Sequence, residues 1–345
     1  MKSAMVPRGF RRFSSRRSSG RRQGNAYEDD GISLNSQFGK KTLNRMNAHL
    51  AAFEDKQRGG PREPSAREVK RWEKIMAKKS ERTLTPEYLA QPIFRPNSAA
   101  LLHFGDKSMV DYEDKVPVGV FPGAIHVVST AEEELQHRAA LESMRVVGID
   151  CETKPSLFRN YASSPIALVQ LASHDTALLY RVRWSGAWNP NLTFPGLQHV
   201  LANKDTIKVG HGCAFDFKSL RECRVASHVV NTVDTLPVAT KIGCLKPNLR
   251  ALGMIWQHLQ ISKAMQTSNW EAPLLTNDQV EYAATDAWLA RQVMLGLMQF
   301  APSRPYLTAV HYTDSRQGDD NLMGSSNDEI VAQLLEVAQL EQHRL

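Results

Sequence analysis

Residues 146–155 read VVGIDCETKP, an apolar run that leads into two acids flanking a cysteine. Side chains of a β-strand alternate between its two faces, so Asp150 and Glu152 point one way and Cys151 points the other way, as a small core residue. Two neighbouring carboxylates on one face repel each other unless a cation lies between them. The stretch therefore predicts either a divalent-metal site or two solvated loop carboxylates, and the remaining sequence decides between them.

The surrounding sequence predicts ordered structure from about Ala124 onward. Apolar β-branched runs indicate strands, and longer periodic segments indicate helices. We expect strands at 124–130, 145–150, 165–173, 176–182, 206–212 and, last, 229–235, and helices at 131–143, 195–203, 214–223, 247–259 and 276–300. The strands first meander and then alternate with helices, which predicts an α/β fold: a mixed sheet with helices on its faces.

Acidic residues recur at two further places in this pattern. Asp216 follows the strand at 206–212, and Tyr282 and Asp286 lie four residues apart, so they share one helix face. With Asp150 and Glu152 they make four carboxylates and one phenol. Two-metal phosphodiester hydrolysis requires such a set, because hard cations such as Mg²⁺ prefer oxygen ligands and the phenol can orient and help deprotonate the attacking water.

Three motifs built from these residues carry a resemblance to a known family. The first, D-x-E-T, begins at Asp150; the second, VGHGCAFDFKSL, contains Asp216; the third, Y-x-x-x-D, ends at Asp286. Over about residues 124–300 the sequence resembles the DEDD superfamily of 3′–5′ exonucleases, in the subgroup with a tyrosine in the third motif. It is similar to ribonuclease D, Werner-type and polymerase-proofreading domains. Gly212 stands where proofreading members carry asparagine, which favours the Werner-type members.

The resemblance implies an RNase H-like fold, two Mg²⁺ ions or Mn²⁺, and removal of nucleotides from a 3′ end. It assigns the metals to Asp150, Glu152, Asp216 and Asp286, gives Tyr282 the positioning of the water, and matches Thr153 to a position that touches the terminal nucleotide. The partner is then a nucleic acid. We expect RNA in preference to DNA, although the choice depends on contacts with the 2′-hydroxyl that none of the motifs fixes.

Three further side chains are candidates for substrate binding, each with a structural alternative. His211 could contact substrate or be a structural residue at the end of a strand. Lys218 could bind phosphate or simply solvate its helix. Trp270 could stack on a base, or it could pack in a core or loop.

The N-terminal segment differs from the rest of the chain in charge. Residues 1–22 contain Lys2 and seven arginines and no acid, whereas the chain as a whole carries a formal charge of +7. An Arg- and Ser-rich segment without acids is typical of a mitochondrial transit peptide. The alternatives are a nuclear import signal, an RNA-binding arm or a solvated tail.

The remaining segments complete the predicted domain organisation. Residues 23–123 are expected to be an extended linker with a basic helix over 66–80 and an irregular, Pro-rich part over 82–123. Residues 124–300 form the exonuclease domain, and 301–345 form a tail with an amphipathic helix. Its apolar positions are Ile330, Leu334, Val337 and Leu340. This helix could dock on the domain or on a partner.

Composition excludes several classes of protein. No stretch approaches the roughly 18 consecutive apolar residues of a membrane helix. The four cysteines form no C-x-x-C pair, so neither a zinc knuckle nor a redox motif is supported, and reduced thiols in an intracellular compartment are expected. Long, partly basic extensions around a nearly neutral body leave one rival function: an RNA-binding component or assembly factor of a ribonucleoprotein, such as a mitochondrial ribosome.

Overall fold

The computed structural model describes residues 70, 86–113, 115–154, 165–184, 192–312 and 324–342. All of them belong to the second of two compact units into which the chain divides, spanning 62–345. The predicted basic segment 1–22 and, apart from Lys70, the predicted helix over 66–80 lie outside the described residues.

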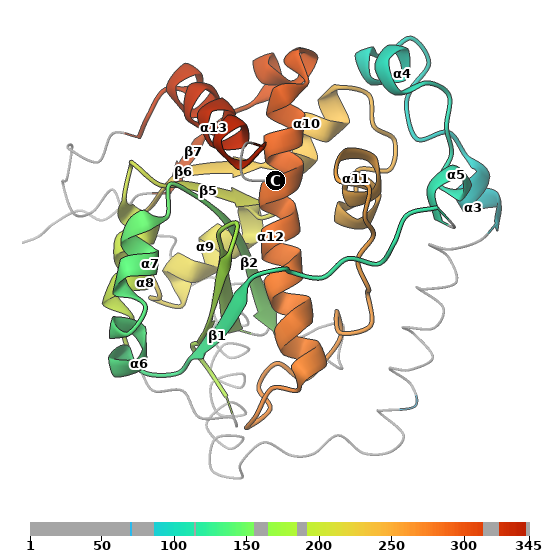
Figure 1. The fold of residues 1–345 in the computed structure, drawn as a ribbon. Helices are drawn as coiled ribbons and strands as arrows, with labels where there is room; N and C mark the ends of the chain where they lie inside the picture. Colours follow the sequence, from blue (N-terminus) through green and yellow to red (C-terminus); the bar gives the residue numbers. More distant parts are fainter. Residues whose placement is uncertain are drawn as a thin grey trace, which may run out of the picture. The chain divides into compact units, whose positions relative to one another are not determined.

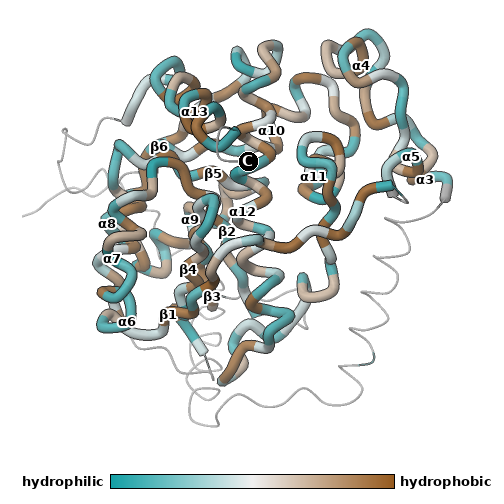
Figure 2. Tube along the Cα trace, viewed as in Figure 1, coloured by the Kyte–Doolittle hydropathy of each residue, from teal (hydrophilic) through white to brown (hydrophobic). Residues whose placement is uncertain are grey.

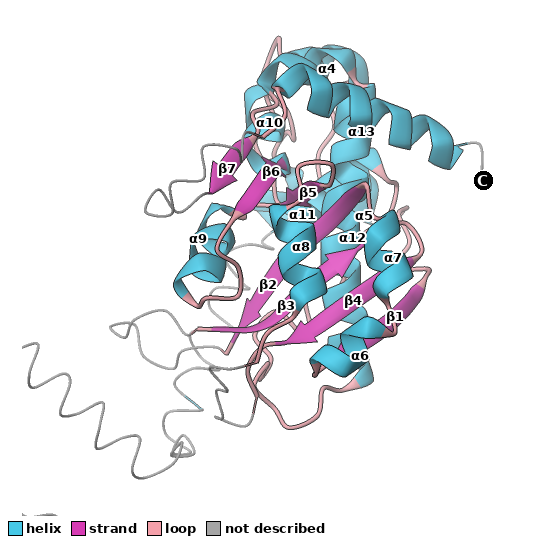
Figure 3. Ribbon diagram, turned by 90° about the vertical axis from the view of Figure 1, so that its left-hand side faces the viewer, coloured by secondary structure: helices cyan, strands magenta, loops and turns pink. Residues whose placement is uncertain are grey.

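The described residues form a seven-stranded mixed sheet (Figures 1 and 3). The strands are β1 (Ala124–Val128), β2 (Val146–Thr153), β3 (Ile166–Ala172), β4 (Thr176–Arg181), β5 (Ile207–Gly210), β6 (Val229–Asp234) and β7 (Val310–Tyr312). Across the sheet their order is β1-β4-β3-β2-β5-β6-β7, with an antiparallel β2-β3-β4 meander and parallel pairs β1-β4, β2-β5 and β5-β6. The predicted fold class is confirmed. The expectation that 229–235 is the last strand is wrong, because β7 pairs antiparallel with β6 at the edge.

Helices cover both faces of this sheet. They are α3 (Pro86–Ala90), α4 (Ala99–Phe104), α5 (Val110–Glu113), α6 (Ala131–Leu135), α7 (Arg138–Ser143), α8 (Pro195–Ala202), α9 (Ala214–Glu222), α10 (Thr235–Lys241), α11 (Leu249–Trp256), α12 (Asn277–Gln299), α13 (Asn327–Gln342) and the 3-10 helix η1 (Ala301–Tyr306). Helices α10 to α13 share one hydrophobic core with the sheet, and α7, α8 and α9 share the other. Figure 1 shows α12 running along the sheet in front of β2.

The central strand β2 contributes to both cores. Val146 faces the core with α12, whereas Val147 and Ile149 face the core with α8 and α9. Figure 2 shows hydrophobic residues along β3 and β4, whereas α12 combines hydrophobic and hydrophilic residues. Cys151 packs on the side of Val147 and Ile149, opposite to the acids, as the alternation predicts. No helix in the described part of the chain is both long and apolar enough to cross a membrane.

Two local predictions are wrong. The helix expected over 131–143 is interrupted, because α6 ends at Leu135 and α7 begins at Arg138. The stretch 82–123, expected to be irregular, contains α3, α4 and α5. Its residues Ile93 and Phe94 are buried in the same core as α12, so order begins well before Ala124.

The C-terminal helix α13 docks on the domain, which is one of the two predicted alternatives. Ile330, Leu334 and Val337 are buried against the core with α12, while the fourth predicted apolar position, Leu340, is 50 % exposed. The buried Arg291 of α12 pairs with Glu341 of α13. A second pair joins Arg145 to Glu336 at 2.8 Å.

Candidate active site

Three of the predicted metal ligands meet at the end of β2. Each of Asp150, Glu152 and Asp286 offers a carboxylate oxygen within 4.8 Å of the other two. Asp150 and Glu152 leave the face of β2 that packs on α12, and Asp286 comes from α12. Gly148 makes this approach possible, because a Cβ there would lie 1.8 Å from the Ala287 carbonyl oxygen. The sequence thus places the strand and the helix close enough for their acids to meet.

The fourth acid, Asp216, lies beside this group and is not one of the three. It is half-buried in the first turn of α9. Burial, followed by the charges of Asp150 and Asp234, raises the pKa of Asp216 to about 8. The structure therefore brings three predicted ligands to one point and places the fourth within electrostatic reach of Asp150.

The turn that carries Asp216 is held by an acid that the sequence analysis missed. The Asp234 carboxylate accepts the N–H groups of Gly212 and Cys213, at 2.8 and 3.0 Å. Gly212 has a φ of +66°, a left-handed conformation that glycine adopts without strain. Asp234 also caps α10 by accepting the Leu236 N–H at 2.9 Å. The sequence signal that could have identified Asp234 was its position between a predicted strand and the helix that follows.

The pKa values of the three carboxyl groups are raised by burial, and those of Glu152 and Asp286 also by repulsion from neighbouring carboxylates. Burial raises the pKa of Asp150, and burial with the charges of Asp150, Asp286 and Asp216 raises that of Glu152. Burial and Asp150 raise the pKa of Asp286 to about 8. Asp286 Oδ1 has no hydrogen-bond partner among the described residues. Oxygen donors that converge at a partly buried site and repel one another fit hard divalent cations such as Mg²⁺.

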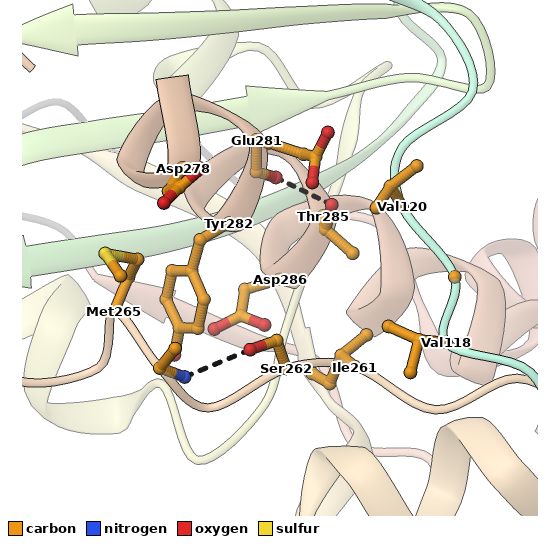
Figure 4. Close-up of a pocket in the computed structure, with 12 residues that line it drawn as sticks. Val118, Val120, Ile261, Ser262, Met265, Asp278, Glu281, Tyr282, Thr285 and Asp286 are labelled. Atoms are coloured by element: carbon orange, nitrogen blue, oxygen red, sulfur yellow. Dashed lines mark hydrogen bonds between the residues drawn. The ribbon is translucent and has the colours of Figure 1, made fainter. Parts of the chain in front are cut away.

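Tyr282 lies beside Asp286 on the same face of α12 (Figure 4). Burial and the Asp286 charge raise the pKa of its hydroxyl, so the phenol stays protonated at neutral pH. Trp270 packs near Tyr282, with ring centroids 6.1 Å apart. The prediction that Trp270 stacks on a base needs correction, because the side chain is fully buried and supports Tyr282 from within the core.

The other predicted substrate contacts lie around the site in different settings. Thr153 is half-buried at a register shift between β2 and β3. His211 Nδ1 lies 2.8 Å from Thr235 Oγ1, and burial lowers its pKa. Lys218 is exposed and pairs with Glu222 one turn along α9, at 3.6 Å. Their roles in substrate binding stay predictions.

Charged contacts that the sequence analysis missed bind the loop before α12 to the sheet. The Glu271 carboxylate pairs with Lys154 at 3.6 Å and with Arg183 at 3.0 Å. Arg181 donates to the Pro273 carbonyl at 2.7 Å. These contacts connect the end of the first motif to the segment that leads into the third. In the sequence, only the position of Lys154 directly after the first motif indicated that a charged contact could form there.

A family model described as 3′–5′ exonuclease matches residues 125–299, half of the chain. The chain is 32 % identical over 174 residues to human exonuclease 3′-5′ domain-containing protein 2, covering 48 % of this chain and 27 % of the human protein. It is also 32 % identical over 188 residues to the mouse bifunctional 3′-5′ exonuclease/ATP-dependent helicase WRN, covering 51 % of this chain and 13 % of the mouse protein. The chain thus spans about a quarter of the human relative's length.

Solved structures of similar proteins include two nuclease domains. The Aedes aegypti Nibbler EXO domain gives a TM-score of 0.46 at 15 % identity and covers 63 % of this chain and all of that domain. Escherichia coli RNase D gives a TM-score of 0.45 at 19 % identity, and the match covers 53 % of this chain and 46 % of RNase D.

Proposed function

This chain belongs to the 3′–5′ exonuclease family, within the DEDD superfamily, and on that premise we propose that it hydrolyses the terminal phosphodiester bond at the 3′ end of a nucleic acid. One observation carries the proposal: Asp150, Glu152 and Asp286 meet within 4.8 Å at the end of the central strand β2, with Asp216 beside them. Carboxylates this close repel one another when they are ionised, and a cation between them would remove that repulsion.

In the proposed reaction these acids would hold two Mg²⁺ or Mn²⁺ ions. Bound ions would supply a Lewis acid for the phosphate and a water of lowered pKa. Tyr282 keeps its proton, because burial and Asp286 raise the pKa of the hydroxyl. We therefore give it the role of a hydrogen-bond donor that orients the attacking water. We assign contact with the terminal nucleotide to Thr153, which lies at the register shift next to Glu152.

The proposed substrate is RNA in preference to DNA. Support comes from the Arg- and Ser-rich composition of residues 1–22, since such arms neutralise RNA phosphates. Mitochondrial location rests on the same residues and can be tested by cell fractionation. The rival function, a scaffold in a ribonucleoprotein, finds no specific support among the described residues.

The test is digestion of 5′-labelled single-stranded RNA and DNA of equal sequence, with Mg²⁺, with Mn²⁺ or with EDTA. We expect a ladder that shortens from the 3′ end, is lost in EDTA and is lost in Asp150→Asn. Asp106→Asn, in an exposed loop of the same compact unit, is the matched control and should keep full activity. Wild-type activity in Asp150→Asn, or no hydrolysis by the wild type, would reject the proposal, and the faster substrate would give its class.

A further inference from the structure

A cavity of about 220 Å³ opens beside the candidate metal ligands. Figure 4 shows Val118 and Val120 on one side of it and Met265 and Tyr282 on the other, with Asp286 between them. We call this cavity the slot. It has aliphatic walls and ends at two of the residues that the proposed reaction uses.

One wall of the slot is a short segment, residues 116–121, which we call the valine strap. Its Gly119 N–H donates to the Gln260 carbonyl at 2.8 Å, and the Gln260 N–H donates back to the strap at 2.9 Å. The Phe121 N–H donates to Thr285 Oγ1 at 2.9 Å. Thr285 immediately precedes the metal-binding acid of α12. The strap is therefore fixed to the helix that carries the site.

Some side chains of the strap point into the core, and others point into the slot. Val116 and Phe121 are buried, and the Phe121 ring packs on Trp288 with centroids 6.1 Å apart. Val118 and Val120 face the slot and are 63 % and 47 % exposed. The buried pair accounts for the attachment of the strap. The exposed pair adds nothing to the core, and it leaves apolar surface in water that an apolar occupant would cover.

Charge and size limit what can occupy the slot. Asp278 and Glu281 stand at its rim as exposed carboxylates, so a phosphate is repelled there. An uncharged planar base with apolar faces meets no such repulsion. The volume of about 220 Å³ is below the roughly 300–1,000 Å³ of pockets for drug-sized ligands, which suits one base and not two.

We propose that the slot holds the base of the 3′-terminal nucleotide and that Val118 and Val120 form one of its walls. The proposal rests on the proposed function and adds a residue-level determinant of substrate binding. The valine strap lies before residue 125, outside the span that the family model matches.

The test compares two labelled strands, of whichever nucleic acid the wild type degrades faster, that differ only in the base at the 3′-terminal residue: one normal and one abasic. For removal of that residue with Mg²⁺, we expect wild-type kcat/KM to be about tenfold higher on the normal end, about 1.4 kcal/mol. In the double variant Val118→Ala/Val120→Ala this ratio should fall to near one, with the rate on the abasic end unchanged. A second readout is the fluorescence of a 3′-terminal 2-aminopurine strand on binding in EDTA, where the wild-type change should be lost in the variant.

The matched control is Val127→Ala/Val310→Ala, two exposed valines on β1 and β7 that do not line the slot. It should keep the wild-type ratio and fluorescence change. Equal wild-type rates on both ends would overturn the proposal, and so would an equal loss on both ends in the strap variant, since that marks a purely structural strap. A wild type that degrades neither strand would reject the proposed function, while the fluorescence measurement would still decide whether the slot takes a base.

Discussion

The buried acids should make the metal-free protein less stable as the pH rises. Asp286 has a pKa of about 8 in the folded chain against an ordinary 3.8. Below about pH 4 both states hold the proton, and between the two values the folded state holds a proton that the unfolded state has lost. The free energy of unfolding then falls by about 1.4 kcal/mol per pH unit for each such carboxyl, or by about 2.7 kcal/mol from pH 5 to pH 7.

A divalent cation should reverse this dependence. It binds the ionised carboxylates, so its contribution to the free energy of unfolding grows as the pH rises. The assay is chemical denaturation at pH 5, 6, 7 and 8, in EDTA and in saturating Mg²⁺. Without metal, Asp286→Asn should flatten the slope by up to about 1.4 kcal/mol per pH unit, whereas Asp106→Asn should leave it unchanged.

The comparison between variant and wild type isolates the site from other titrating groups. A slope that is the same in wild type and Asp286→Asn would refute the reasoning, because it would mean that the carboxyl is ionised in the folded, metal-free protein. Equal stabilisation by Mg²⁺ at pH 5 and pH 8 would refute it too.

Three further substitutions test the geometry. Gly148→Ala should lower the free energy of unfolding by about 1–3 kcal/mol and weaken Mg²⁺ binding in calorimetry, because its Cβ would meet the Ala287 carbonyl oxygen at 1.8 Å; unchanged values would contradict the close packing of β2 on α12. Tyr282→Phe should reduce kcat by about 10²–10⁴-fold while Mg²⁺ affinity by calorimetry stays as in the wild type. Glu341→Gln should cost about 3–5 kcal/mol in denaturation, because it leaves the buried Arg291 without its counter-charge; a loss below 1 kcal/mol would show that this pair adds little.

The parts of the site that could be predicted are those with a local signal. Strand alternation placed Asp150 and Glu152 on one face and Cys151 on the other, and helical spacing placed Tyr282 one turn before Asp286. Each relation depends only on the geometry of one element, which a short sequence window contains.

The parts that escaped prediction depend on contacts between distant residues. The strap hydrogen bond joins Phe121 to Thr285, 164 residues apart. The position of Val118 and Val120 beside the slot can be recognised only once that contact is known. Trp270 is a second case: its sequence context left base stacking and core or loop packing open, and the surrounding fold buries it. Burial of an aromatic ring is set by everything that packs around it, and one segment does not reveal that.

The position of α12 depends on segments at both ends of the family domain. The valine strap attaches to Thr285, while α13 attaches to Arg291, whose Nε also donates to the Val146 carbonyl of β2 at 2.8 Å. The helix that carries Asp286 is thus tied to the strand that carries Asp150 through a guanidinium that α13 holds in place. Residues 125–299 contain the acids but neither of these flanking supports. Residues 125–299 therefore contain the proposed catalytic groups, and the segments on either side of them hold α12 in place.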